Sequence, residues 1–249
     1  MRIWDMNVAF GELDENGNEL TPERLYEMMD AYGIERAVAY HTLAKFDHST
    51  GNAKMAEIAA KSNGRIGFCA VLDPALGADS LTGEGDLAAR LRASGAEAIR
   101  VFPTELRVAF HPFYFEEIFE AAEALSMPII IDEPTTPVPE LFSRLPDMAK
   151  DYPGIKFIII RYGVCNGRHI KPLAKKLDNV YFTVEKMLDY LQIEELCEAG
   201  CADKLLFGSE YPLLDPAGTI GLILLADVEN GVKEQILAKN WEAIRYDNS

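Results

Sequence analysis

Charged side chains stand at the ends of several short apolar runs in this chain. Asp132, Arg161 and Glu210 each close such a run. Burying an ionised group without a partner is costly, so each must face an opposite charge, a hydrogen-bond network or a wet pocket. Groups of this kind can move protons or hold a charged substrate. We therefore predict that these three residues carry the chemistry of the protein.

Four further polar residues lie at comparable positions and are predicted to bind a substrate. They are Asn7, His41, Arg100 and Glu185. Arg100 is suited to clamping a carboxylate or phosphate, and pairing with a neighbouring carboxylate explains it equally well. His41 could exchange a proton near neutral pH or serve as a hydrogen-bonded loop residue. Asn7 could line the site or cap a strand end.

Eight apolar, often β-branched runs are separated by longer segments with helical periodicity, which predicts strands that alternate with helices. The predicted strands are 2–8, 35–40, 66–72, 96–102, 128–132, 156–161, 180–184 and 204–210. Eight such units in 249 residues favour a single α/β domain over residues 1–249, a (β/α)8 barrel with its reacting groups at the carboxyl ends of the strands. An open doubly wound sheet is the alternative, but the glycine-rich phosphate loop that usually follows its first strand is absent.

Glycines and capping residues mark where helices begin and end. Five glycines stand between a predicted helix and the next strand, where a left-handed C-cap suits glycine best. They are Gly33, Gly64, Gly95, Gly154 and Gly200. Thr21, Pro22 and Glu23 supply an N-cap, a first-turn proline and a first-turn acid, so a helix should begin there.

The composition limits the classes of partner. A formal net charge of −16 argues against binding to nucleic acid or to an anionic membrane surface, because both need clustered Lys and Arg. Cys69, Cys165, Cys197 and Cys201 form no C-x-x-C pair and have no His at zinc-ligand spacing, so we expect reduced thiols. No apolar run reaches the length of a signal peptide or a membrane span. We expect a cytoplasmic protein with a small-molecule ligand. The formation of a homo-oligomer is left open by the sequence.

Four blocks of sequence, in order along the chain, resemble strands of one known family. They are residues 4–11 (WDMNVAFG), 127–132 (MPIIID), 153–163 (PGIKFIIIRYG) and 206–212 (LFGSEYP). They are similar to the D-x-H-x-H-F-G opening and to the fifth, sixth and eighth strands of the amidohydrolase superfamily, in its amidohydrolase-related branch of decarboxylases, lactonases and hydrolases. The resemblance implies a TIM barrel, as the alternation of runs does.

The resemblance also implies a metal site, whose ligands differ here. In the family, four histidines and an aspartate at these strand ends bind a divalent metal that activates water. The matching positions hold Asn7, Ala9, Asp132, Arg161 and Glu210. Alanine has no donor atom, and arginine is not deprotonated in proteins. We expect no tightly bound metal or other cofactor, with a Mg or Ca ion on the remaining carboxylates as a minor alternative. The Arg161 guanidinium is hypothesised to replace the metal charge and to pair with Asp132 or Glu210.

Two functions from different classes remain. The first is a metal-independent hydrolase that acts on a small carboxylated substrate of the lactone, ester or amide class. In it, Glu210 or Asp132 is the general base, and Arg161 and Arg100 hold the substrate anion and the developing oxyanion. The second is a catalytically silent barrel that binds a small molecule or a partner.

Overall fold

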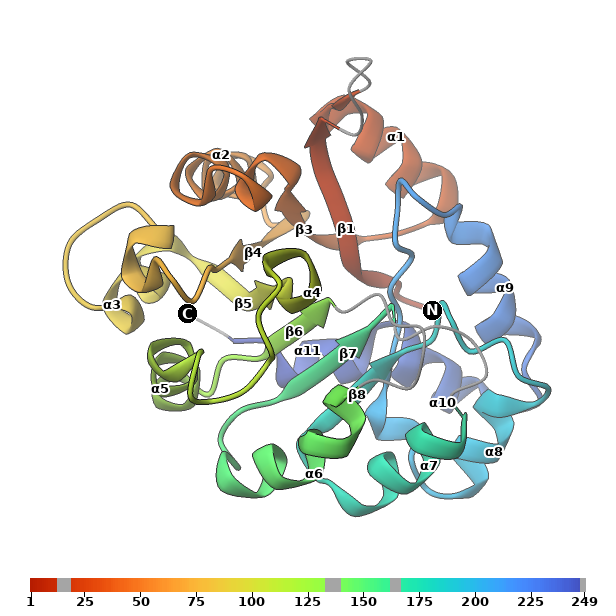
Figure 1. The fold of residues 1–249 in the computed structure, drawn as a ribbon. Helices are drawn as coiled ribbons and strands as arrows, with labels where there is room; N and C mark the ends of the chain where they lie inside the picture. Colours follow the sequence, from red (N-terminus) through yellow and green to blue (C-terminus); the bar gives the residue numbers. More distant parts are fainter. Residues whose placement is uncertain (13–18, 133–139, 162–166, 247–249) are drawn as a thin grey trace.

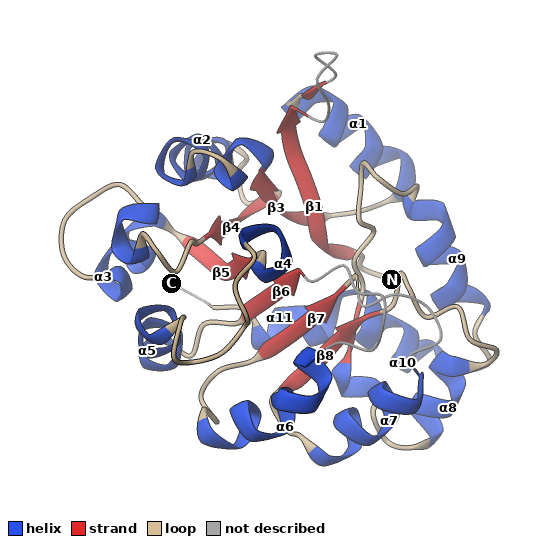
Figure 2. Cartoon of the chain, viewed as in Figure 1, coloured by secondary structure: helices blue, strands red, loops and turns tan. Residues whose placement is uncertain are grey.

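A curled sheet of mostly parallel strands forms the centre of the molecule, and helices surround it (Figure 1). The structure is a computed structural model that describes residues 1–12, 19–132, 140–161 and 167–246. Its strands are β1 (Trp4–Glu12), β2 (Glu19–Leu20), β3 (Arg36–His41), β4 (Ile66–Val71), β5 (Ala96–Val101), β6 (Ile129–Asp132), β7 (Phe157–Ile160), β8 (Val180–Thr183) and β9 (Leu205–Leu206). Most of the helices lie around the outside of this sheet (Figure 2).

The eight predicted strands are confirmed, with shifts at their ends. They pair in parallel in chain order from β1 through β3 to β9, and the short β2 pairs antiparallel with the end of β1. The largest difference is β9, which ends at Leu206 although the predicted strand reaches residue 210. Beyond it, the chain passes close to β1, because a Cβ on Gly208 would lie 2.7 Å from Asn7 Cβ. A larger residue at 208 would force these two segments apart.

Contacts between β1 and the segment after β9 close the sheet into a barrel. The Met6 amide donates to the Phe207 carbonyl at 3.1 Å, and the Ala9 amide donates to the Tyr211 carbonyl at 2.9 Å. Val8 and Tyr211 also form a parallel bridge. The fold is therefore the predicted TIM barrel rather than the open alternative.

The helices follow the strands and begin or end largely as the sequence predicts. They are α1 (Pro22–Tyr32), α2 (His48–Lys61), α3 (Leu87–Ser94), α4 (Pro103–Leu106), α5 (Glu116–Leu125), α6 (Glu140–Asp151), α7 (Gly167–Lys176), α8 (Gln192–Glu198), α9 (Pro216–Leu225), α10 (Asn230–Glu234) and α11 (Asn240–Ile244), with short 3-10 or π segments η1 (Thr42–Lys45), η2 (Gly77–Ser80), η3 (Ala202–Lys204) and η4 (Gln235–Lys239). Within the described residues, none of these helices has the length and apolar character that a membrane span requires.

The predicted caps are confirmed with one exception. The Thr21 side chain accepts from the Arg24 amide at the start of α1, and Gly33 caps the end of that helix with φ +67°. Gly64, Gly95 and Gly200 also adopt positive φ, whereas Gly154 does not, so the prediction is wrong there. A hydrogen bond from the Ile155 amide to the Tyr152 carbonyl forms the turn after α6 instead.

On most barrel strands, alternate residues pack into two separate hydrophobic cores. On β7, Ile159 belongs to the large core that also contains helix residues, so this core fills the space between sheet and helices. Its neighbours Ile158 and Ile160 belong to the smaller core inside the barrel, to which Trp241 of α11 also belongs. This alternation follows from the period of two along a strand. The polar residues at the strand ends therefore lie above the inner core.

Asp5 links β1 to the segment after β9 through its side chain. Its Oδ1 accepts from the Asn7 amide at 3.1 Å and from the Ser209 amide at 2.9 Å. Asp5 is fully buried. Burial raises the pKa of its carboxyl to about 6, and the hydrogen bonds from Ser209 and Asn7 oppose this rise. Asp5 Oδ1 therefore adds a side-chain link to the backbone contacts that hold the two segments together.

We predict that Asp5→Ala lowers the free energy of unfolding by about 2–4 kcal/mol, because two buried amides lose their acceptor. Asp5→Asn keeps an oxygen at this position and should stay within about 1 kcal/mol of the unsubstituted protein. Urea unfolding at pH 7 measures both values. Equal stability of Asp5→Ala and Asp5→Asn would contradict this role of the carboxylate.

Candidate active site

A chain of alternating charges crosses the carboxyl ends of the strands. Arg100 on β5 donates to Asp132 Oδ2 at 2.5 Å, and Arg161, directly after β7, lies 3.4 Å from Asp132 Oδ1. Arg161 Nε is 3.0 Å from Glu210 Oε1, and Lys186 Nζ is 3.0 Å from Glu210 Oε2. We call these five residues the charge network. The pairing predicted for Arg161 is present with both carboxylates.

Two of the three cations of the charge network, Arg161 and Lys186, are its accessible part. Asp132 has no exposed side-chain surface and Glu210 has 7%, whereas Arg161 and Lys186 expose 27% and 25% of theirs. Three cations face two anions, so the network carries an excess positive charge in a protein with a formal net charge of −16. An anion is the natural ligand of such a surface.

Arg100 is held from several sides and is buried. Its guanidinium donates to Asn7 Oδ1 at 2.9 Å as well as to Asp132, and it lies 4.3 Å from the centre of the Tyr40 ring. Burial is the largest single influence and opposes its charge, but Asp132, Tyr40 and Cys69 together outweigh burial, and the pKa of Arg100 is raised. Only 3% of the side chain is exposed. Arg100 therefore compensates the charge of Asp132 from a buried position, and Asn7 lies in the same cluster.

The local backbone turns Arg161 and Glu210 toward the barrel axis. Ile158 and Ile160 point inward from β7, so simple alternation would direct residue 161 outward. Arg161 instead has φ +53° and Glu210 has φ +61°, a left-handed conformation that costs a non-glycine residue of the order of 1–3 kcal/mol. Such conformations persist where the surrounding contacts hold them, and the ion pairs of the charge network are those contacts here.

Lys186 is a member of the charge network that the sequence predictions missed. It lies three residues beyond the end of β8, past the last position at which a strand-end residue was expected. The sequence did contain an indication of this role, because Lys186 directly follows the predicted site residue Glu185. A cation beside a carboxylate at a strand end could have been included on the same grounds as Arg100.

Glu185 lies in the same region but is not part of the ion-pair chain. It is buried, and Thr183 Oγ1 donates to its Oε1 at 2.7 Å. Its Oε2 has no hydrogen-bond partner among the residues that the structure describes. Burial raises the pKa of Glu185 to about 8; the Thr183 hydrogen bond opposes this, and the nearby Glu210 adds to it. At neutral pH, Glu185 therefore holds a proton and can serve as a hydrogen-bond donor.

His41 has a different local role. Its Nδ1 accepts from the Leu43 amide at 3.1 Å and caps η1, and its ring packs edge-on against Phe10. Burial lowers the pKa of His41, with a smaller contribution from Lys54. These contacts match the loop role considered for His41, and the structure does not bring it into the charge network.

The donor set at these strand ends does not suit a divalent metal. Asp132 and Glu210 already face two cations each, and Asn7 Oδ1 accepts from Arg100. Across residues 1–12, 19–132, 140–161 and 167–246, no group of three or more His, Cys, Asp and Glu side chains could hold a metal ion. A cation placed between the two carboxylates would also meet the Arg161 guanidinium.

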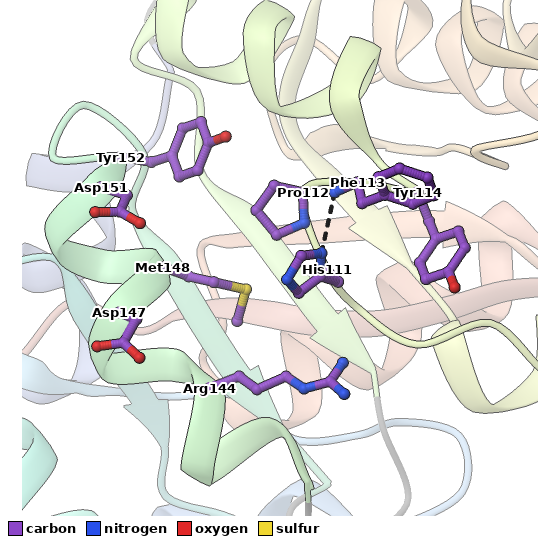
Figure 3. A pocket seen from close by; sticks show the side chains of 9 residues that line it. All are labelled: His111, Pro112, Phe113, Tyr114, Arg144, Asp147, Met148, Asp151 and Tyr152. Carbon is purple, nitrogen blue, oxygen red and sulfur yellow. Dashed lines mark hydrogen bonds between the residues drawn. The ribbon is translucent and has the colours of Figure 1, made fainter.

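Other candidate features lie apart from the charge network. A cavity of about 590 Å³ is lined by His111 to Tyr114, in the segment before α5, and by residues of α6 and Tyr152 (Figure 3). No network residue lines it.

Cys69, Cys197 and Cys201 are free thiols. Burial raises the pKa of Cys69 to about 12, as expected for an inert thiol. Tyr162, Gly163 and Cys165 lie outside the described residues.

Comparisons with solved structures place this fold among TIM barrels. The chain is similar to an uncharacterised TIM-barrel protein from Bordetella bronchiseptica, with 16% identity, a TM-score of 0.74 and 98% of each chain covered. It is also similar to a probable 2-pyrone-4,6-dicarboxylic acid hydrolase from Acinetobacter baumannii with citric acid bound, with 15% identity, a TM-score of 0.72 and coverage of 98% of this chain and 99% of that chain. A third is a dihydroxybenzoic acid decarboxylase from a Polaromonas species with bound manganese and the inhibitor 2-nitroresorcinol, with 16% identity, a TM-score of 0.70 and coverage of 98% and 96%. Likeness at these identities establishes the fold alone.

Comparison with family models identifies the chain more closely. No curated protein matches it. The family model described as Amidohydrolase matches residues 7–244, which include every member of the charge network and Asn7. The chain belongs to the amidohydrolase family.

Proposed function

We propose that this protein is a hydrolase that acts on a small carboxylated substrate of the lactone, ester or amide class without a resident divalent metal. The observation that carries the proposal is the position of Arg161, whose guanidinium contacts both Asp132 and Glu210 where the family pattern has a metal. A guanidinium keeps its positive charge at any working pH and suits carboxylate geometry. It can therefore stabilise an anion that develops during hydrolysis.

The accessible cations support a carboxylated substrate. Arg161 and Lys186 both reach the surface of the site from the two sides of Glu210. The relatives described above have names that refer to a dicarboxylic acid and to a hydroxybenzoic acid. In the proposed complex, the substrate carboxylate takes over contacts with Arg161 and Lys186, which reduces the positive charge that these two cations direct at Glu210.

The roles of the remaining residues follow from their burial. Glu210, once its cations are shared with the substrate, accepts a proton from the attacking water. Asp132 is fully buried between two guanidiniums, so we assign it and Arg100 to positioning rather than to substrate contact. Glu185 holds a proton at neutral pH, and we assign it to donate that proton to the leaving group.

A silent binding protein is the second candidate, and one observation favours it. Both carboxylates that could act as bases are already paired with cations, which makes a carboxylate a weaker base. The same cationic surface would then bind a carboxylated molecule without turnover. Binding of carboxylates with no hydrolysis of lactones, esters or amides would select this alternative.

The direct test is hydrolysis by protein treated with a chelator. We would assay a panel of carboxylated lactones, esters and amides together with their uncharged counterparts, and measure the metal content of the same sample. The proposal expects turnover of carboxylated members with less than stoichiometric metal. Activity that requires an added divalent ion would overturn the metal-free part of the proposal.

Replacing Arg161 should remove the activity. We predict that Arg161→Met lowers kcat/KM by about 100-fold or more, because the site loses a charge that stabilises the transition state. Arg161→Lys should retain part of the activity, since the charge stays and the planar geometry is lost. Arg168→Met, on an exposed arginine of α7, is the matched control and should change nothing. Circular dichroism and melting temperature establish that each variant is folded, and full activity of folded Arg161→Met would refute the assigned role.

Glu185 should make stability fall as pH rises. Its pKa is about 8 in the folded protein against an ordinary value of 4.5 for glutamate, so the folded state binds an extra proton between these values. The stabilisation is complete below about pH 4.5 and is lost as pH rises through about 8. From pH 5 to pH 8.5, we expect the unsubstituted protein to lose a few kcal/mol more than Glu185→Gln, as an order of magnitude. Urea unfolding across this range measures the difference.

Glu120→Gln, at an exposed position of α5, is the control and should keep the original pH dependence of stability. If stability falls with pH in Glu185→Gln as steeply as in the unsubstituted protein, the prediction is contradicted.

A further inference from the structure

A second cavity lies beside the charge network and has not yet been assigned a role. Its volume is about 380 Å³, within the range of small-molecule sites. Its lining comes from the end of β1, from β3 and the turn after it, and from the segment after Glu210. These are carboxyl ends of neighbouring barrel strands, where TIM barrels bind their substrates.

Tyr40 connects this cavity to the charge network. It lines the cavity, and its ring lies 4.3 Å from the Arg100 guanidinium, which in turn donates to Asp132. Pro212 and Leu213 form another part of the lining, and the Leu213 amide donates to the Glu210 carbonyl at 2.9 Å. The turn that presents Glu210 therefore also builds a wall of the cavity.

The lining is mainly apolar, with charges at its edge. Tyr40, Phe46, Pro212 and Leu213 supply ring and aliphatic surface, and Phe46 and Leu213 are 86% and 66% exposed. Lys45 also lines the cavity but is engaged by Glu105 at 2.7 Å. Glu12 adds a negative charge, so the cavity itself is unsuited to the anionic end of a ligand. It fits an uncharged, flat or apolar group.

Ala9 determines how much room this cavity has. Its backbone is fixed, because Ala9 pairs with Tyr40 of β3 and its amide donates to the Tyr211 carbonyl at 2.9 Å. Its side chain is half-buried and packs against the inner core. A larger side chain at this position would extend into the cavity, since the backbone that carries it cannot withdraw from the sheet.

We infer that Ala9 is a specificity-determining residue that opens a subsite for the apolar body of the substrate. The subsite takes a flat or aliphatic group, while the carboxylate of the same molecule contacts Arg161 and Lys186. The inference rests on the proposed function for the carboxylate end only. The substrate class is thereby narrowed to carboxylates that carry a ring or a compact apolar group.

The test compares ligands that contain one or both of the recognised parts. The probes are 2-naphthoate, its neutral counterpart 2-naphthamide, and acetate, titrated into the full chain by calorimetry or by NMR for weak binding. We expect 2-naphthoate to bind more tightly than either of the others. Ala9→Leu should weaken 2-naphthoate binding at least 10-fold and leave acetate unchanged. Ala60→Leu, an exposed alanine of α2, is the matched control and should change neither.

A second variant protects the test against a folding defect of Ala9→Leu. Phe46→Ala removes a largely exposed ring from the cavity edge and should weaken 2-naphthoate several-fold without affecting acetate. Unchanged 2-naphthoate binding in both variants, or no 2-naphthoate binding by the unsubstituted protein, would overturn the subsite. The proposed function fails separately if Arg161→Met binds 2-naphthoate and acetate as tightly as the unsubstituted protein does. In that case, 2-naphthamide binding that is still sensitive to Ala9→Leu would keep the subsite and remove the carboxylate clamp.

Discussion

The charge of Asp132, buried with no exposed side-chain surface, constrains the whole site. An ionised carboxylate in such a place costs several kcal/mol unless cations and hydrogen bonds compensate it. Arg100 and Arg161 provide this compensation from the two neighbouring strand ends. Parallel register makes the arrangement possible, because Arg100 pairs with Ile130 and Asp132 pairs with Ile160, the residue before Arg161. Any slip of β5, β6 or β7 would leave the carboxylate unpaired, so the network and the register depend on each other.

The strand ends could be predicted because their signals are local. Apolar runs, glycines and caps locate the eight strands and the helix that begins at Pro22, and the period of two indicates which strand residues face inward. The strand-end positions predicted for Asn7, Arg100, Asp132 and Glu210 put them at one end of the barrel, and the structure brings Asn7, Arg100 and Asp132 into contact there. Arg161 was included for its place at the end of a run, although its inward direction depends on a left-handed backbone that alternation does not predict.

What the sequence did not reveal depends on contacts between distant segments. Lys186 joins the network because the segment after β8 brings it to Glu210, and nothing near Lys186 in the sequence specifies that distance. The early end of β9 has the same origin, since the chain beyond it is held by β1 rather than by β8. His41 shows the opposite case: its type suggested chemistry, but the nearest available donor, the Leu43 amide, made it a cap. Pairing partners, more than residue types, decide such roles.

A divalent cation and the Arg161 guanidinium compete for the same two carboxylates. A dication about 4 Å from the guanidinium would be repelled by roughly 8 kcal/mol at an effective dielectric constant near 20, which is comparable to a micromolar binding free energy. Metal could enter only if Arg161 moved outward, and its 27% exposure shows that it has a path to solvent. That movement would leave Asp132 with Arg100 and Glu210 with Lys186, so both carboxylates would keep one cation each. The choice between guanidinium and metal is therefore a balance of charges within one site. In the complex that we propose, a substrate carboxylate in contact with Arg161 and Lys186 would hold the guanidinium in place.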